Sequence, residues 1–500
     1  MTQHLIDDEL AEQDLLACAT RVAETIDNVE GHGEAMAGAA ARYADAGQFD
    51  FAVALAETIG DPYIRDRTLS DIAVKSFEAG EGDDAMRLLE TIEDPGWQEE
   101  SAAQISLKRA AAGHYRQAAE LARQMQDASS TLAEIAVKWA EASHYDEALE
   151  LVRDIESQGS AASALAEIAS IYTKAGQRGE AAELLSQATM RARSVELTED
   201  RVSILVSIGV KYAEAGEPEK AEEVLAEASR LAESVEIERY RENSLAQVSF
   251  GFARLGQGER ALETAALIDD SFQAAMAHAN LASEHLRAGR REEGLAMLSR
   301  ALELAEAEEY YQENTYPMSK YRALSAIAVQ YAEADLYRQA TQTAKLIESE
   351  QDRSAALIEV ERALMRVGNI DQALNAARMI EDQSLGVIAL TTLAQSLIKD
   401  GQQERALNIL AEARRIAVAI PWPNDKTLAF AEIARKYAAT EQAEETAQLL
   451  LHALETSAGI ESRYSLALAL AQLSDVYDET GAEIDEHAMN ILREIVIKLD

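Results

Sequence analysis

The sequence predicts an all-α protein, a right-handed superhelical solenoid of antiparallel helix pairs. Only 5% of the 500 residues are aromatic and six are proline, although 48% are apolar, a composition that suits closely packed helices better than β-sheet. Apolar residues at helical spacing, interrupted by single glycines, recur along almost the whole chain. Because a chain of this length exceeds one compact core, these observations favour a continuous array of repeats.

Each repeat consists of an amphipathic helix, a one-residue break and a second amphipathic helix, as in EIASIYTKAGQRGEAAELLSQA. Ten of the thirteen predicted break residues are glycine, as expected where a helix ends in a left-handed conformation that disfavours a β-carbon. The thirteen breaks are Gly47, Gly80, Gly113, Ser143, Gly176, Gly216, Gly256, Gly289, Asp335, Gly368, Gly401, Glu441 and Gly481.

Several rows of side chains keep a constant distance from the breaks. Eight residues before the break the residue is aliphatic in nearly every repeat, eleven before it is often leucine, and four before it is often aromatic. These positions share one face of the first helix and predict its core side. Alanine recurs five residues after the break, where a small side chain lets two antiparallel helices approach closely.

The second helices fall into a short and a long class. Twelve residues after the break, short repeats carry a bulky residue, such as Ile59, Ile155 or Ile347. Long repeats carry alanine there, at Ala188, Ala228, Ala301, Ala413 and Ala453. We expect the bulky residue to fill the core where a short helix ends, and the alanine to let a longer helix continue in close contact.

This pattern resembles the tetratricopeptide repeat, most closely at Leu205, Ile208, Gly209, Tyr212, Gly216, Ala221, Leu225 and Ala228. Leucine replaces the family's usual tryptophan, and the proline that closes each unit is missing, so HEAT-like helix pairs are the alternative. The resemblance implies about thirteen helix pairs over residues 34–499, with the first helices on the concave face.

The N-terminal segment 1–33 is predicted to be a capping half-repeat, because Ala19, Ala23 and Ile26 match Ala52, Ala56 and Ile59 of the first repeat. Two irregular segments, 305–322 and 420–426, are predicted hinges. The first contains a candidate loop contact for a partner, since tyrosine is common in interfaces, with packing on adjacent helices as the alternative. Its residues are Tyr310, Tyr311 and Tyr316.

The concave face is predicted to carry a partner-binding groove. Six residues before the break, many first helices present an apolar side chain among alanines, a surface that suits an amphipathic helix or an extended peptide. The candidate residues are Val74, Leu107, Val137, Val210, Phe250 and Val329. The alternative is that they only contact neighbouring first helices. These rows lack the lysines and asparagines with which some family members clamp a terminal carboxylate.

The net charge is −43, from 46 basic and 89 acidic residues, and such a surface repels the phosphates of nucleic acid. With only 12 lysines, the chain suits a salt-rich cytosol, but an ordinary acidic repeat protein has the same appearance. No apolar stretch is long enough for a membrane span, and the start, MTQHLIDDEL, lacks a secretory pattern, so we expect a cytoplasmic protein.

No catalytic, phosphate-binding or metal-binding motif is found, so neither an enzyme nor a cofactor or metal is predicted. The one cysteine, Cys18, excludes an intramolecular disulfide. His278 and His285 are two helical turns apart, too far for one ion without other ligands. The leading hypothesis is a non-catalytic scaffold that holds a partner's helix or peptide. A regulatory sensor of a small ligand or signalling protein and a self-assembling structural solenoid are the alternatives. Partner identity and oligomeric state stay open.

Overall fold

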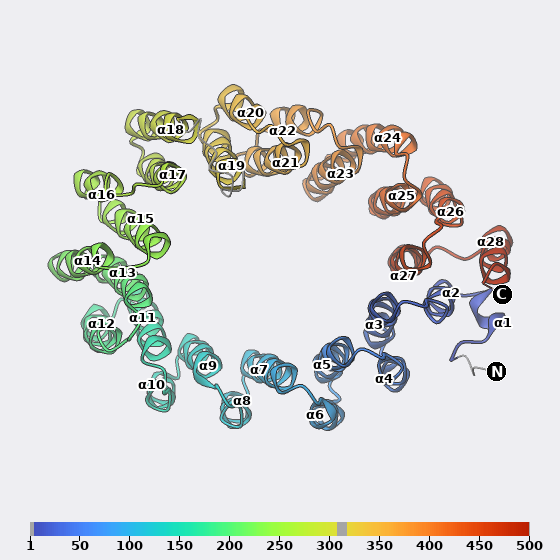
Figure 1. Cartoon of the computed structure of the whole chain (residues 1–500), viewed down its shortest axis with the longest axis horizontal. Helices are drawn as coiled ribbons and strands as arrows, with labels where there is room; N and C mark the ends of the chain where they lie inside the picture. Colours follow the sequence, from blue (N-terminus) through green and yellow to red (C-terminus); the bar gives the residue numbers. More distant parts are fainter. Residues whose placement is uncertain (1–4, 308–317, 500) are drawn as a thin grey trace. The chain divides into compact units, whose positions relative to one another are not determined.

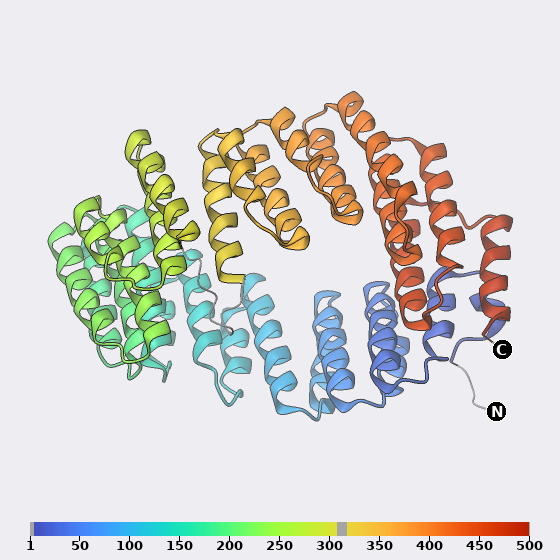
Figure 2. The same ribbon diagram turned by 45° about the horizontal axis from the view of Figure 1, so that its top comes forward.

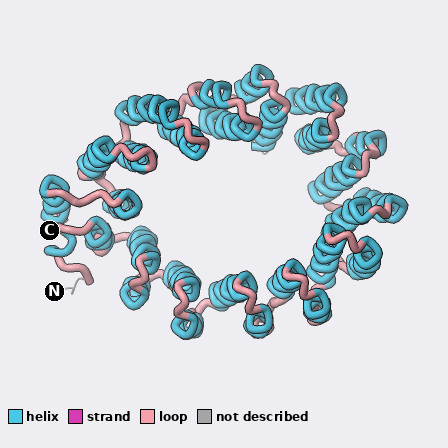
Figure 3. Tube along the Cα trace, turned by 180° about the vertical axis from the view of Figure 1, so that it is seen from behind, coloured by secondary structure: helices cyan, strands magenta, loops and turns pink. Residues whose placement is uncertain are grey.

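The computed structural model of this chain describes residues 5–307 and 318–499, and within them it contains 28 α-helices and no strand (Figure 3). The prediction of an all-α fold is confirmed. The chain divides into two compact units, which we call unit 1 (Met1–Ala102 with Ile370–Asp500) and unit 2 (Ala103–Asn369).

Unit 1 contains helices from both ends of the chain. Its N-terminal part contains α1 (Asp8–Ala11), α2 (Leu15–Ala23), α3 (Val29–Asp45), α4 (Phe49–Glu57), α5 (Pro62–Glu78) and α6 (Gly82–Thr91). Its C-terminal part contains α22 (Ile370–Ala377), α23 (Gln383–Lys399), α24 (Gln403–Ala419), α25 (Pro423–Ala438), α26 (Ala443–Ser457), α27 (Arg463–Thr480) and α28 (Glu486–Ile497).

Helix α7 (Pro95–Ala111) begins in unit 1 and ends in unit 2. The rest of unit 2 contains α8 (Tyr115–Ala122), α9 (Ser129–Glu141), α10 (Tyr145–Arg153), α11 (Gln158–Lys174), α12 (Arg178–Ala192), α13 (Thr198–Ala215), α14 (Pro218–Glu233), α15 (Glu238–Arg254), α16 (Gly258–Ala265), α17 (Ser271–Arg287), α18 (Arg291–Glu306), α19 (Met318–Glu333), α20 (Tyr337–Lys345) and α21 (Glu350–Arg366).

Within each unit the helices form two layers (Figures 1 and 2). In unit 2 the first helices of the repeats, α9, α11, α13, α15, α17, α19 and α21, pack side by side on the concave side. The second helices lie outside them, and from α10 to α20 each packs on its own first helix and on the next one, as α12 does on α11 and α13. The core lies between the two layers and is rich in alanine, leucine and isoleucine.

All thirteen predicted break residues have a positive φ, including Ser143 at 68°, Asp335 at 62° and Glu441 at 61°. The residue after each break donates its N–H to the carbonyl of the residue four before the break, as from Gln177 to Tyr172 at 2.9 Å and from His144 to Trp139 at 3.2 Å. This closing hydrogen bond satisfies a carbonyl at the end of the first helix. The thirteen predicted break residues thus have the left-handed conformation expected of them.

The two classes of second helix are also confirmed. Short second helices have 8–10 residues, and Ile59, Ile155 and Ile347 lie just after such a helix and are at most 4% exposed. Long ones have 15–17 residues, and the corresponding alanines, Ala188 and Ala228 among them, are fully buried within the helix. A bulky side chain therefore closes the core where a short helix ends.

In unit 1 the two ends of the chain pack together (Figure 1). Helix α2 lies along α27 as extensively as a second helix lies along its own first helix, and it also contacts α3. Helix α28, which follows α27 in the sequence, packs instead on α26, α2 and α1. The N-terminal half-repeat therefore supplies the second helix of the last repeat.

Candidate protein-binding surface

A ladder of ion pairs joins consecutive first helices. A basic residue near the end of one first helix reaches a carboxylate on the preceding one. The pairs are Lys75–Asp45 (2.6 Å), Lys211–Glu167 (3.0 Å), Arg254–Glu214 (3.0 Å) and Arg366–Glu333 (2.8 Å). These four basic residues are therefore paired within the protein, which leaves fewer cations for an acidic ligand.

The ladder continues where the chain ends meet in unit 1. Arg42 of α3 donates to both carboxylate oxygens of Asp475 on α27, with N–O distances of 2.9–3.1 Å. The ion pair between α27 and α3 thus corresponds to the ion pair between α3 and α5, which joins Asp45 and Lys75. The first-helix layer of unit 1 is accordingly continuous through α23, α25, α27, α3 and α5.

The predicted groove residues lie in the first-helix layers, but none of them is fully exposed. Val74, in unit 1, is 7% exposed. The other five are half-buried, and Leu107 and Val137 pack against the core of unit 2. Tyr310, Tyr311 and Tyr316 lie outside the described residues.

Two of the predicted residues line hollows in unit 2. Val137 lines one of about 280 Å³ between α9 and α11, beside Glu134, Lys138 and Glu167. Phe250 lines another of about 370 Å³ across α15, α17 and α19, beside Phe272, Met276 and Asn280. Each hollow is lined by both apolar and polar side chains.

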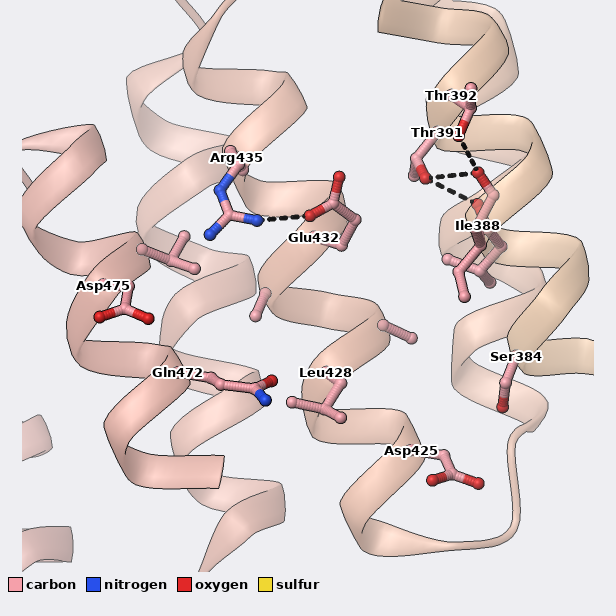
Figure 4. Close-up of a pocket in the computed structure, with 14 residues that line it drawn as sticks. Ser384, Ile388, Thr391, Thr392, Asp425, Leu428, Glu432, Arg435, Gln472 and Asp475 are labelled. Carbon is pink, nitrogen blue, oxygen red and sulfur yellow. Dashed lines mark hydrogen bonds and ion pairs between the residues drawn. The ribbon is translucent and has the colours of Figure 1, made fainter. Parts of the chain in front are cut away.

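A hollow of about 570 Å³ on the first-helix layer of unit 1 lies on α23, α25 and α27 (Figure 4). Its apolar wall comes from Val387, Ile388, Leu428, Ala429, Ala431 and Val476, and its rim includes Asp425, Glu432, Arg435, Gln472 and Asp475. None of these residues was among the predicted groove residues. The sequence nevertheless carries a signal, because the residue thirteen before the break is apolar in these three repeats, at Ile388, Leu428 and Leu468.

Most polar groups around this hollow are already paired. Thr391 donates its hydroxyl to the Val387 carbonyl at 2.9 Å, and Thr392 donates to the Ile388 carbonyl at 2.8 Å. Arg435 donates to Glu432 at 2.6 Å and also pairs with Glu479. The hollow therefore offers mainly apolar contact.

Among the described residues no group of three or more histidine, cysteine, aspartate and glutamate side chains is arranged to hold a metal ion. His278 and His285 are hydrogen-bonded nearby, to the Ala274 carbonyl at 2.9 Å and to the Arg290 Nε at 3.2 Å. Burial lowers the pKa of both imidazoles. Over the same described ranges, no helix has the length and apolarity that a bilayer crossing requires.

Neither a protein-family model nor a curated protein matches this sequence. The solved structures that it resembles include yeast Tom70, at 12% identity and a TM-score of 0.26 over 90% of this chain and 97% of the other. Human IFIT1, solved as a dimer with m7Gppp-AAAA, has 14% identity and a TM-score of 0.30 over 83% and 96%. A signal-transduction ATPase of Pyrococcus horikoshii with a tetratricopeptide repeat sensor has 17% identity and a TM-score of 0.24 over 69% and 52%. The fold described above rests on the helix pairs of this chain themselves.

Proposed function

We propose that this chain is a non-catalytic scaffold that holds a helix or peptide of a partner protein on its first-helix layer. The observation that carries the proposal is the series of hollows on this layer, two of which are lined by the predicted residues Val137 and Phe250. Apolar hollows with a polar rim are suited to anchoring the side chains of a bound segment.

The charge of the chain favours a basic partner. Its net charge of −43 attracts cationic segments and repels anionic ones, and complementary charge speeds association. Four basic residues of the first helices, Lys75, Lys211, Arg254 and Arg366, already form ion pairs with carboxylates of this chain. Assembly of several copies end to end would need an uncovered last repeat. In this chain α2 packs on α27 in the place of a second helix, which disfavours such assembly through α27.

A selection from a library of displayed random peptides tests the proposal. We expect the enriched peptides to contain apolar and basic residues, and we expect Phe250→Ala and Val137→Glu to weaken their binding. Met190→Glu, at a 59% exposed position on the outer helix α12, is the matched control and should change nothing. Failure to enrich any binder, or equal binding by all three variants, would contradict the proposal.

A further inference from the structure

The apolar residues of the first helices change position in the last three repeats. Six residues before the break, seven of the ten earlier repeats carry an apolar residue, whereas these repeats carry Gln395, Arg435 and Asp475. Thirteen residues before the break, eight of the ten earlier repeats carry a polar residue such as Ser130 or Asn243, whereas these repeats carry Ile388, Leu428 and Leu468. The apolar surface of α23, α25 and α27 has therefore moved to the opposite end of the first helices.

Ile388 is unusual among the large apolar side chains of the described residues. It is 45% exposed, and the other exposed large apolar side chains lie at helix ends, on linkers or outside the first-helix layer. Leu428 beside it is half-buried, while Val387 and Val476 are buried. Figure 4 shows Ile388 and Leu428 on neighbouring helices, with Asp425 towards one end of the hollow and Arg435 towards the other.

One carboxylate of this hollow lacks a cation. Asp475 is held by Arg42, and Glu432 pairs with Arg435 and Lys436. Asp425, by contrast, accepts only a 3.4 Å hydrogen bond from Asn424 and forms no ion pair with the described residues. The N-terminal end of α25 favours its charge but does not neutralise it. A negative charge beside an exposed apolar surface complements a ligand that is apolar and cationic at adjacent positions.

We propose that the hollow of α23, α25 and α27 anchors one apolar side chain of a partner protein, next to a lysine or arginine that pairs with Asp425. This inference rests on the proposed function and specifies the kind of segment bound. The occupant is a peptide segment and not a small molecule, because the hollow is an open stretch of the first-helix layer. Its threonine hydroxyls are also used within α23, which leaves few polar groups to orient a small ligand.

Fluorescence anisotropy with a labelled amphipathic peptide of leucine and lysine tests this inference. Two further probes replace lysine by glutamate, or leucine by serine. We expect the leucine–lysine peptide to bind, the serine peptide to bind at least tenfold more weakly, and the glutamate peptide not to bind. Binding should weaken between about 0.15 M and about 1 M salt, because the charge contribution is screened.

Two pairs of variants locate the site. Ile388→Glu should weaken binding of the leucine–lysine peptide at least tenfold, whereas Val418→Glu, at a 59% exposed position on the outer helix α24, should not. Asp425→Asn should weaken it several-fold and reduce the salt dependence. Glu404→Gln, which removes an exposed carboxylate from the first turn of α24, should do neither. Thermal melts of each variant, and the milder Ile388→Ala, separate loss of binding from loss of folding.

Either of two results would overturn the inference. One is the absence of binding by the leucine–lysine peptide. The other is equal binding by Ile388→Glu and Val418→Glu, which would show a diffuse attraction to the acidic surface. In both cases the scaffold proposal would still be judged by the displayed-peptide selection, because that selection also samples the hollows of unit 2.

Discussion

Three of the thirteen left-handed residues, Ser143, Asp335 and Glu441, carry a β-carbon where the others are glycine. A left-handed conformation costs a residue with a β-carbon about 1–2 kcal/mol relative to a right-handed one. Asp335 recovers part of this cost, because its carboxylate accepts a 2.6 Å hydrogen bond from Asn369. For Ser143 and Glu441 the described side-chain hydrogen bonds include no such compensation.

Ser143→Gly and Glu441→Gly should therefore each stabilise the protein, by about 0.5–1 kcal/mol after the greater unfolded-state entropy of glycine is counted. Thermal or urea unfolding of the single and double variants measures the gain. Ala142→Gly is the control, because φ of Ala142 is −80° and a glycine there only loosens the helix end. A gain for Ala142→Gly equal to that for Ser143→Gly would contradict the explanation.

Glu361 departs from a row of small residues. Seven residues before the break the other repeats have only glycine, alanine or serine, such as Ala328 and Ala394, whereas this repeat has a fully buried glutamate. Within the described structure neither carboxylate oxygen has a hydrogen-bond partner. Burial raises the pKa of Glu361 from 4.5 to about 8, opposed by the nearby charge of Arg362 and reinforced by that of Glu359.

Stability should therefore fall as the pH rises between about 4.5 and about 8. In this window the carboxyl group ionises in the unfolded chain and stays protonated in the folded one, so ionisation favours unfolding. Glu361→Ala should remove this part of the pH dependence, and should stabilise the protein above about pH 7 while costing packing near pH 5. Urea unfolding of both proteins across this range is the measurement. Parallel pH profiles would show that Glu361 does not titrate as proposed.

At the scale of elements, α2 is the unexpected helix. It begins close to the N-terminus of the chain, yet it serves as the second helix of α27, near the C-terminus. Two contacts beside the α2–α27 pair also join the chain ends: Arg42 with Asp475, and Arg493 of α28 with Glu12 at 3.3 Å. We call these contacts between the two chain ends the closure of unit 1. The one cysteine of the chain, Cys18, can report on it, because Cys18 lies in α2 and is fully buried.

Cys18 should react with a thiol reagent only when α2 leaves its place, because burial raises the pKa of its thiol to about 12 and shields it. Arg42→Ala should speed labelling about two- to fivefold, equivalent to ~0.4–1 kcal/mol for a partly exposed ion pair. Lys75→Ala removes the equivalent pair between α5 and α3, away from the closure, and should leave the rate unchanged. Equal acceleration by both variants, or labelling as fast as in unfolded protein, would argue against the closure.

At the scale of the whole molecule, the dominant property is the excess of 89 acidic over 46 basic residues. Many of the basic residues are already paired, so added salt screens more repulsion than attraction. We expect the melting temperature to rise between about 0.1 M and about 1 M potassium chloride, with most of the rise below about 0.5 M, where screening changes most. Sucrose at matched osmolality controls for general stabilisation, and a flat or falling melting temperature would refute the expectation.

Much of this architecture depends on interactions between residues close in the sequence, and it could therefore be predicted from the sequence. The thirteen breaks, the paired helices and the two lengths of second helix depend on residues within a few helical turns of one another, so their periodic spacing reveals them. The sequence also shows that Ile388, Leu428 and Leu468 are apolar at a position where most other repeats carry a polar residue. The sequence does not show which of these side chains are covered by neighbouring helices, so it does not predict the exposure of Ile388.

Only the tertiary structure reveals that α2 pairs with α27 and that Arg42 pairs with Asp475. These residues are hundreds of positions apart, and a half-repeat that pairs with the last first helix has the same local sequence as one that caps an open end. Likewise, the sequence showed that Glu361 stands in a row of small residues, but only packing decides that its carboxyl group is buried without a partner. Local periodicity determines the repeat, and long-range packing determines which helices pair at the chain ends of unit 1 and which side chains stay exposed.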